Sequence, residues 1–209
     1  MRDRDPDSPV TVINRFQVRG DAEEFEKVLA DHSEFLRGQP DFDFLVTAAV
    51  VDRPGVYVHL GHWRTLRGFR AMAHEAAFAR EVRQLGPLVH ATADQAMSLG
   101  RTLLDRATTG ATNIVLLYAK ARQGGEGFER RFARLDRACV RLGGFGGSDL
   151  LRSTLHPGSY TGVLWWRRAE DCERALADSA YAAGLAELSE VAEVSTERSR
   201  HLAYERAFH

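Results

Sequence analysis

The chain has 209 residues, of which 44% are hydrophobic and 27% are charged, and its 28 basic residues nearly balance its 29 acidic ones. This composition is typical of a soluble globular protein and excludes a disordered or fibrous chain. The formal net charge of −1 provides no basic surface for nucleic acid or an anionic membrane, so we expect neither as a partner.

The sequence also predicts where the protein resides in the cell. No apolar run approaches the roughly 20 residues of a membrane-spanning helix. Residues 1–9 are charged and lack the apolar core of a secretory signal, so we predict a disordered tail and a cytoplasmic protein. Cys139 and Cys172 lack a CxxC pattern, which favours reduced thiols over a disulfide or a zinc site.

The first strand is predicted at residues 10–18, where apolar residues alternate on one face and Asn14 is the polar exception. A helix is expected between Asp21 and Gly38, with Phe25, Leu29 and His32 on its inward stripe. The later elements follow in chain order: strands at 42–52 and 56–63, a helix from about Thr65, a second helical segment at 76–85 and a weaker strand at 90–99.

The sequence contains an internal repeat with one constant offset of 103 residues. The offset joins Phe25 to Phe128, Phe42 to Phe145, Pro54-Gly55 to Pro157-Gly158, Tyr57 to Tyr160, Trp63 to Trp166 and Phe78 to Tyr181. A register shared by turn residues and aromatic residues indicates duplication. We therefore predict a first half at residues 10–105, a linker at 106–112 and a second half at 113–209.

Each half has the order β-α-β-β-α-β, which is the ferredoxin-like unit of an α+β protein. Such a unit covers one sheet face with helices and leaves the other face in need of a partner. Two units facing each other satisfy this need, so we expect the two antiparallel sheets to pack as an α/β barrel within one chain. The protein is then a monomeric pseudo-dimer, or a homodimer of such chains.

Three segments resemble one known family, the antibiotic biosynthesis monooxygenases of the dimeric α/β-barrel superfamily. They are "NRFQVRGDAEEFE" at Asn14–Glu26, the strand that ends in Trp63, and "AFAREVRQL" at Ala77–Leu85. Members of this family are mostly single units that dimerise, and this chain resembles a fused dimer.

The resemblance implies an oxygenase that acts on an aromatic polyketide in antibiotic biosynthesis. The reaction expected is oxidation of a phenol or hydroquinone, or oxidative ring opening, with O2 as co-substrate. No metal and no tightly bound cofactor are implied. Two-unit relatives that open angucycline rings use reduced flavin, so FADH2 or FMNH2 from a partner flavin reductase is an open alternative.

The family pattern also implies where the site lies. Trp63 matches a family Trp, Arg83 falls at the place of a family Arg, and Phe69 replaces a Tyr. His59 stands where anthrone oxygenases have an Asn, so an imidazole replaces an amide. The second half retains only the Trp, as Trp166, and we therefore expect the first half to carry the site.

Strand alternation places Tyr57, His59, Gly61 and Trp63 on one face and His62 on the other. The catalytic residues expected are Asn14, which binds a phenol oxygen, His59, which acts as a general base, and Trp63, which forms a wall. The substrate-binding residues expected are His32, Tyr57, Phe69, His74, Phe78 and Arg83. For each of them a purely structural or solvated role is the alternative, and His32 and His74 are alternative bases.

Three other functions fit the same pattern. "NRF" after a strand also resembles haem-degrading relatives, although these need a His late in the second helical region, where "FAREVRQL" has none. A polyketide cyclase would use the same base without O2. A non-catalytic binding module would use the polar residues only to stabilise the core.

Overall fold

The computed structural model describes residues 5–207 of the chain. The first half contains β1 (Val10–Val18), α1 (Ala22–Arg37), β2 (Phe42–Val50), β3 (Val56–Trp63), α2 (Leu66–Ala73), α3 (Ala76–Leu85), the short 3₁₀ helix η1 (Gly86–Leu88) and β4 (Val89–Leu103). The second half contains β5 (Thr112–Ala121), α4 (Gly125–Arg141), β6 (Phe145–Ser153), β7 (Ser159–Trp166), α5 (Ala169–Leu176), α6 (Ser179–Ser189) and β8 (Ala192–Arg206).

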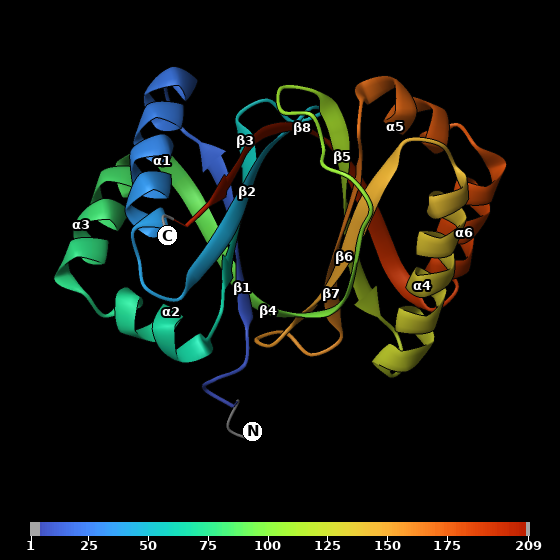
Figure 1. Ribbon diagram of the computed structural model, residues 1–209, viewed down its shortest axis with the longest axis horizontal. Coiled ribbons are helices and arrows are strands. Elements are labelled where there is room, and N and C mark those ends of the chain that lie inside the picture. The colour runs from blue at the N-terminus through green and yellow to red at the C-terminus, as the bar shows by residue number, and fades with distance from the viewer. Residues whose placement is uncertain (1–4, 208–209) are drawn as a thin grey trace.

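The eight strands close into one antiparallel barrel in the order β1-β3-β2-β8-β5-β7-β6-β4. The two halves join where β2 pairs with β8 and where β4 pairs with β6. Helices α1–α3 cover the outside of the first half and α4–α6 the outside of the second, on opposite sides of the barrel (Figure 1). The predicted fold, two tandem ferredoxin-like units that form an intrachain barrel, is confirmed.

Local sequence signals explain where the first helices begin. The side chain of Asp21 accepts hydrogen bonds from the backbone N–H groups of Glu23 and Glu24 and so caps α1. Thr65 caps α2 in the same way through the N–H of Gly68. None of the helices among residues 5–207 is long and apolar enough to cross a membrane.

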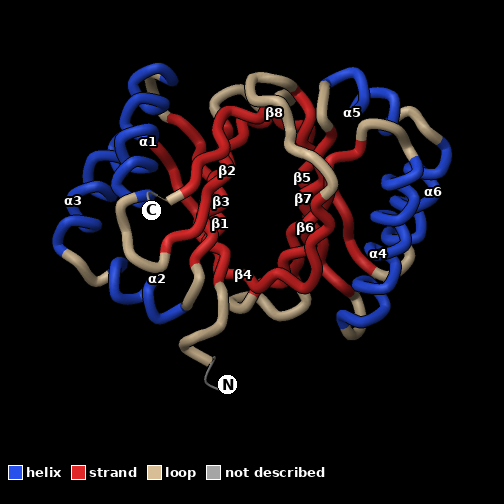
Figure 2. Tube along the Cα trace, viewed as in Figure 1, coloured by secondary structure: helices blue, strands red, loops and turns tan. Residues whose placement is uncertain are grey.

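The strands separate two apolar layers, because successive side chains point to opposite faces of the sheet. One layer fills the barrel, where Ile13 and Leu60 of the first half meet Leu116 and Leu151 of the second. The other layers lie between the barrel wall and the helices, and the strand tubes of Figure 2 mark this wall. His62 lies on the barrel side, apart from His59, as alternation predicts.

Polar groups connect the two halves at each mouth of the barrel. At one mouth, Arg101 of β4 forms an ion pair with Asp149 of β6, with a Nε–Oδ2 distance of 2.8 Å, and its guanidinium contacts Nδ1 of His62 at 3.2 Å. At the other mouth, Arg15 of β1 donates two hydrogen bonds of 2.7 and 2.8 Å to the carboxylate of Glu197 in β8.

One detail shows that the two halves share an arrangement, and a second shows a difference between them. The hydroxyl of Tyr57 donates to Glu26 at 2.7 Å, and that of Tyr160 donates to Glu129 at 2.8 Å, 103 residues later. In the first half, Asp41 fills the space beside Gly68, where an added Cβ would collide with it. The second half reverses this pair: Gly144 replaces the aspartate, and Asp171 replaces the glycine.

Residues 1–4 of the predicted N-terminal tail lie outside the described residues. The following residues contact the start of α2. The carbonyls of Pro6 and Ser8 accept hydrogen bonds from the backbone N–H groups of Arg67 and Leu66, and Asp7 forms an exposed ion pair with Arg67. The N–H groups at this end of α2 thus have partners from the N-terminal segment.

Candidate active site

Three polar side chains cross the sheet of the first half in one row. Asn14 of β1 pairs with His59 of β3, and Thr47 of β2 pairs with the same His59 from the other side. All three belong to the strand face that packs against the helices. Asn14 is half-buried, whereas His59 and Thr47 are buried.

His59 is fully buried and only one of its ring nitrogens has a partner. Nδ1 lies 3.1 Å from Oγ1 of Thr47, while Nε2 is buried without a hydrogen-bond partner. Burial, with a smaller contribution from nearby His32, lowers the pKa of His59 to about 3. The imidazole is therefore neutral at neutral pH.

His32 of α1 faces His59 from the helix layer. The ring centroids of the two histidines are 6.3 Å apart, with planes tilted by 52°. Nδ1 of His32 is also buried without a hydrogen-bond partner, and burial lowers the pKa of this side chain to about 4. The ring of Phe78 on α3 lies 6.0 Å from His32.

Trp63 and its neighbours form an aromatic wall at the end of β3. The indole packs edge-on against Phe42 at 5.2 Å and against Phe69 of α2 at 5.7 Å. Gly61 lies between His59 and Trp63 on the same face, and a Cβ there would reach ordinary contact distance from Trp63 and Phe42. The glycine therefore leaves room for one small group beside the row.

Three further residues expected at the site are placed differently. Tyr57 lies on the same face but is held by Glu26, and burial together with that hydrogen bond raises its pKa to about 12. His74, the C-cap of α2, and Arg83 of α3 are both exposed, and the structure does not bring them to the two histidines.

Thr47 is the residue that the sequence analysis missed. It is an ordinary residue in an apolar strand, and no motif marks it. The signal available was the hairpin register, which pairs Thr47 with His59 across β2 and β3. Its hydroxyl fixes the orientation of the imidazole and thereby leaves Nε2 as the free nitrogen.

The second half builds the same layer without this polar row. Three leucines and a glycine stand 103 residues after the polar side chains of the first half: Leu117 for Asn14, Leu135 for His32, Leu150 for Thr47 and Gly162 for His59. The strand residues among them keep the same pairing, because Leu117 and Leu150 both lie opposite Gly162. Phe132 fills the space over Gly162, where an added Cβ would lie 2.6 Å from its ring. The fold therefore does not require polar groups here, and the polar row is particular to the first half.

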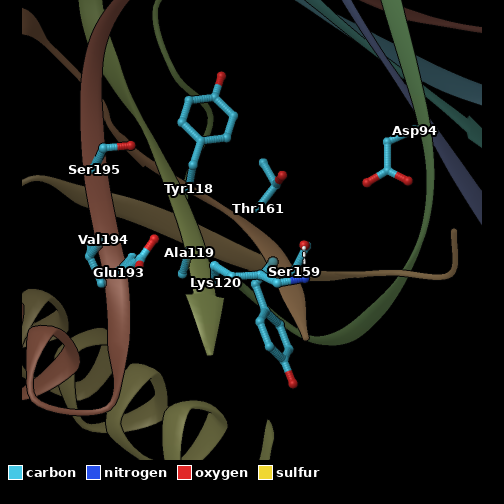
Figure 3. A pocket seen from close by; sticks show the side chains of 10 residues that line it. Asp94, Tyr118, Ala119, Lys120, Ser159, Thr161, Glu193, Val194 and Ser195 are labelled. Atoms are coloured by element: carbon cyan, nitrogen blue, oxygen red, sulfur yellow. Dashed lines mark hydrogen bonds between the residues drawn. The ribbon is translucent and has the colours of Figure 1, made fainter. Parts of the chain in front are cut away.

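A cavity of about 520 Å³ lies elsewhere, at the mouth of the barrel between β4, β5, β7 and β8. Figure 3 shows Asp94 of the first half across from Tyr118 of the second. None of the predicted site residues lines this cavity. Two of its charged groups have partners: Asp94 accepts from Ser153, and Lys120 donates to the carbonyl of Pro157. The histidine pair, with two unpartnered nitrogens, is the stronger candidate for catalysis.

Comparison with known proteins bears on the identity of this site. No protein-family model matches the sequence. The deoxynogalonate monooxygenase of Streptomyces nogalater is 37% identical to the chain over 89 residues, which are 43% of this chain and 68% of that protein. The chain belongs to the antibiotic biosynthesis monooxygenase family.

Solved structures extend the likeness of this monooxygenase to the whole fold. A protein from Fusobacterium nucleatum described as a monooxygenase superposes with a TM-score of 0.79 at 8% identity, covering 95% of this chain and 94% of its own. An anthrone oxidase-like protein superposes with a TM-score of 0.71 at 13% identity, covering 97% of this chain and 95% of its own. At these identities the likeness concerns the two-unit fold alone.

Proposed function

We propose that this monooxygenase oxidises an aromatic polyketide intermediate with O2 in the interior between β1–β3 and the helices of the first half. Membership of the family supports an oxygenase of polyketide biosynthesis. The observation that carries the proposal is the unpartnered Nε2 of His59, in a polar row that the second half replaces by apolar residues and glycine.

The chemistry begins with a proton transfer. Nε2 of His59 takes the proton of a phenol or of an acidic ring methylene, while Thr47 holds the opposite nitrogen. The carboxamide of Asn14 donates a hydrogen bond to the oxygen on which negative charge develops. The resulting anion is electron-rich and reacts with O2.

The substrate itself is able to supply the electrons. A ring methylene and O2 become a ring carbonyl and water, so the carbon is oxidised and both oxygen atoms are reduced. In this form of the reaction O2 is the co-substrate and no tightly bound cofactor takes part. The alternative reaction is oxidative ring opening with reduced flavin, which a flavin reductase would deliver. Oxygen uptake measured with and without the flavin system distinguishes the two reactions.

Substrate entry requires movement, because His59 is 0% exposed and His32 only 5%. The half-buried rings of Phe69 on α2 and Phe78 on α3 pack in one apolar cluster with Trp63, and Phe78 also contacts His32. We therefore place the entrance under α2 and α3, where Trp63 and these two rings form the walls for a flat molecule.

The test is oxygen consumption with a panel of tricyclic and tetracyclic phenols, with and without FMN and a flavin reductase. We expect O2 uptake and incorporation of one ¹⁸O atom from labelled O2. His59→Gln should lower kcat about 100-fold, the usual size of a general-base contribution. His90→Gln, the same change at an exposed histidine of the first half, is the control and should leave kcat unchanged.

Several outcomes would contradict the proposal. Products without the label would indicate a cyclase, and spectral binding of haemin would favour a haem enzyme. Full activity of His59→Gln would remove the proposed base. Oxygen uptake that depends on the flavin system would favour the flavin-dependent variant over direct reaction with O2.

A further inference from the structure

The two buried histidines of the first half are neighbours in the layer between the sheet and α1. His59 comes from the sheet and His32 from α1, with ring centroids 6.3 Å apart. Each ring has one buried nitrogen without a partner, Nε2 in His59 and Nδ1 in His32. An unpartnered buried polar group costs about 1–3 kcal/mol, so two of them side by side need an explanation.

Packing does not provide that explanation. The second half places Leu135 at the position of His32 and keeps the same helix and strand arrangement. The ring neighbours of His32 besides His59 are Phe35 at 6.5 Å and Phe78 at 6.0 Å, which contact a leucine equally well. An imidazole at this position therefore either takes part in chemistry or only lowers the free energy of unfolding.

The proposed reaction needs two proton positions. When a ring methylene and O2 become a ring carbonyl and water, two C–H bonds break and both hydrogens end on the oxygen atom that leaves as water. Each proton must travel from carbon to an oxygen that lies further from the ring. One imidazole fixed by Thr47 reaches one of these places, whereas a pair on opposite walls reaches both.

We propose that His32 is the second proton-transfer residue of this site: His59 removes the proton from the substrate, and His32 returns it to the dioxygen-derived oxygen that leaves as water. The inference rests on the proposed function and adds a role for α1. The proton passes from Nε2 of His59 to Nδ1 of His32, directly or through an oxygen of the bound substrate. Both residues are neutral at the start and at the end of each cycle.

The electrostatics of the pair agree with a relay that holds one proton at a time. Both side chains are buried and neutral, and a charge on His32 lowers the pKa of His59. Two adjacent imidazolium ions are thus disfavoured, and a proton accepted by one ring is readily passed on.

The experiment uses His32→Leu, which installs the residue of the second half and should fold. With a substrate that the wild type oxidises, we expect kcat to fall about 100-fold and KM to change little. Because the departing oxygen is no longer protonated efficiently, its O–O bond breaks more slowly, so we also expect the hydroperoxide formed from substrate and O2 to accumulate, where the wild type forms the carbonyl and water. His32→Ala should regain part of kcat when free imidazole is added, since imidazole fits the space of the lost ring.

Ser33→Ala is the matched control, because Ser33 is a buried polar residue of the same helix turn and only donates to the carbonyl of Leu29. It should leave kcat unchanged and should accumulate no hydroperoxide. If His32→Leu keeps the wild-type kcat and accumulates no hydroperoxide while the wild type is active, the inference falls and the proposed function stands. If the wild type oxidises no member of the phenol panel, the proposed function falls and this inference falls with it.

Discussion

Single buried residues distinguish the first half from the second. Nε2 of His59 and Nδ1 of His32 are buried without partners, and the equivalent positions of the second half are a glycine covered by a phenylalanine and a leucine. Strand alternation singled out Asn14 as a polar residue on an apolar face, whereas His59 was selected by its match to a family position. It could not find Thr47, because a threonine in an apolar strand carries no signal until the register with His59 is known.

The buried histidines should make the stability of the protein depend on pH. Burial lowers the pKa of His32 to about 4, whereas a histidine in the unfolded chain titrates near 6.5. Below about pH 6.5 the unfolded chain binds more protons than the folded protein does. The free energy of unfolding therefore has its full value above this pH and falls as the pH drops towards 4. His32→Leu should remove up to about 3 kcal/mol of this loss.

Urea unfolding of the wild type and His32→Leu at about pH 7, 5.5 and 4.5 measures this difference. The variant should be at least as stable as the wild type near neutral pH and should lead by more as the pH falls. Parallel curves for the two proteins would show that His32 is not held neutral by burial.

The elements within each half were predictable, but the contacts between halves were not. The strand expected at residues 90–99 extends over Val89–Leu103, because its second part pairs with β6 of the other half. Nothing in the sequence around Arg101 points to Asp149, which lies 48 residues later. Local periodicity predicts an element, whereas the length of an edge strand depends on the partner it meets.

The seam between β4 and β6 should be sensitive to loss of one charge. Asp149 is buried, and burial raises its pKa while Arg101 opposes this shift. Arg101→Met should lower the free energy of unfolding by about 2 kcal/mol, because it leaves a buried carboxyl without its cation. Urea unfolding near neutral pH provides the measurement.

Arg67→Met is the control for this prediction. Its ion pair with Asp7 is largely exposed, with both side chains 66% accessible, so the change should cost less than about 0.5 kcal/mol. Equal losses for the two variants would mean that the seam pair contributes no more than a surface pair does.

At the scale of the whole molecule, one offset of 103 residues was sufficient to predict the architecture. Each ferredoxin-like sheet leaves one face uncovered, and the apolar barrel interior is formed only when both halves contribute. The packing around His59 was less accessible to sequence reasoning. A strand pattern gives the direction of a side chain, while the space in front of it depends on how three helices settle onto the sheet.

Cutting the linker should therefore leave the barrel intact. The halves are paired along β2–β8 and β4–β6, and these seams do not involve residues 106–111. A protease site placed in this linker and cleaved after folding should give two chains on a denaturing gel and one particle of unchanged size by gel filtration. Elution of separate halves would show that the covalent connection, and not the shared core, holds the barrel together.

The reversed aspartate and glycine pairs restrict how the two halves can exchange sequence. Asp41 needs Gly68 beside it, and Asp171 needs Gly144. A recombination event between the two repeats, with its crossover between these positions, would bring two carboxylates into one space or leave two glycines around an empty one. Either product is penalised, so a crossover within this window is disfavoured, and the window contains His59, whose counterpart in the second half is Gly162.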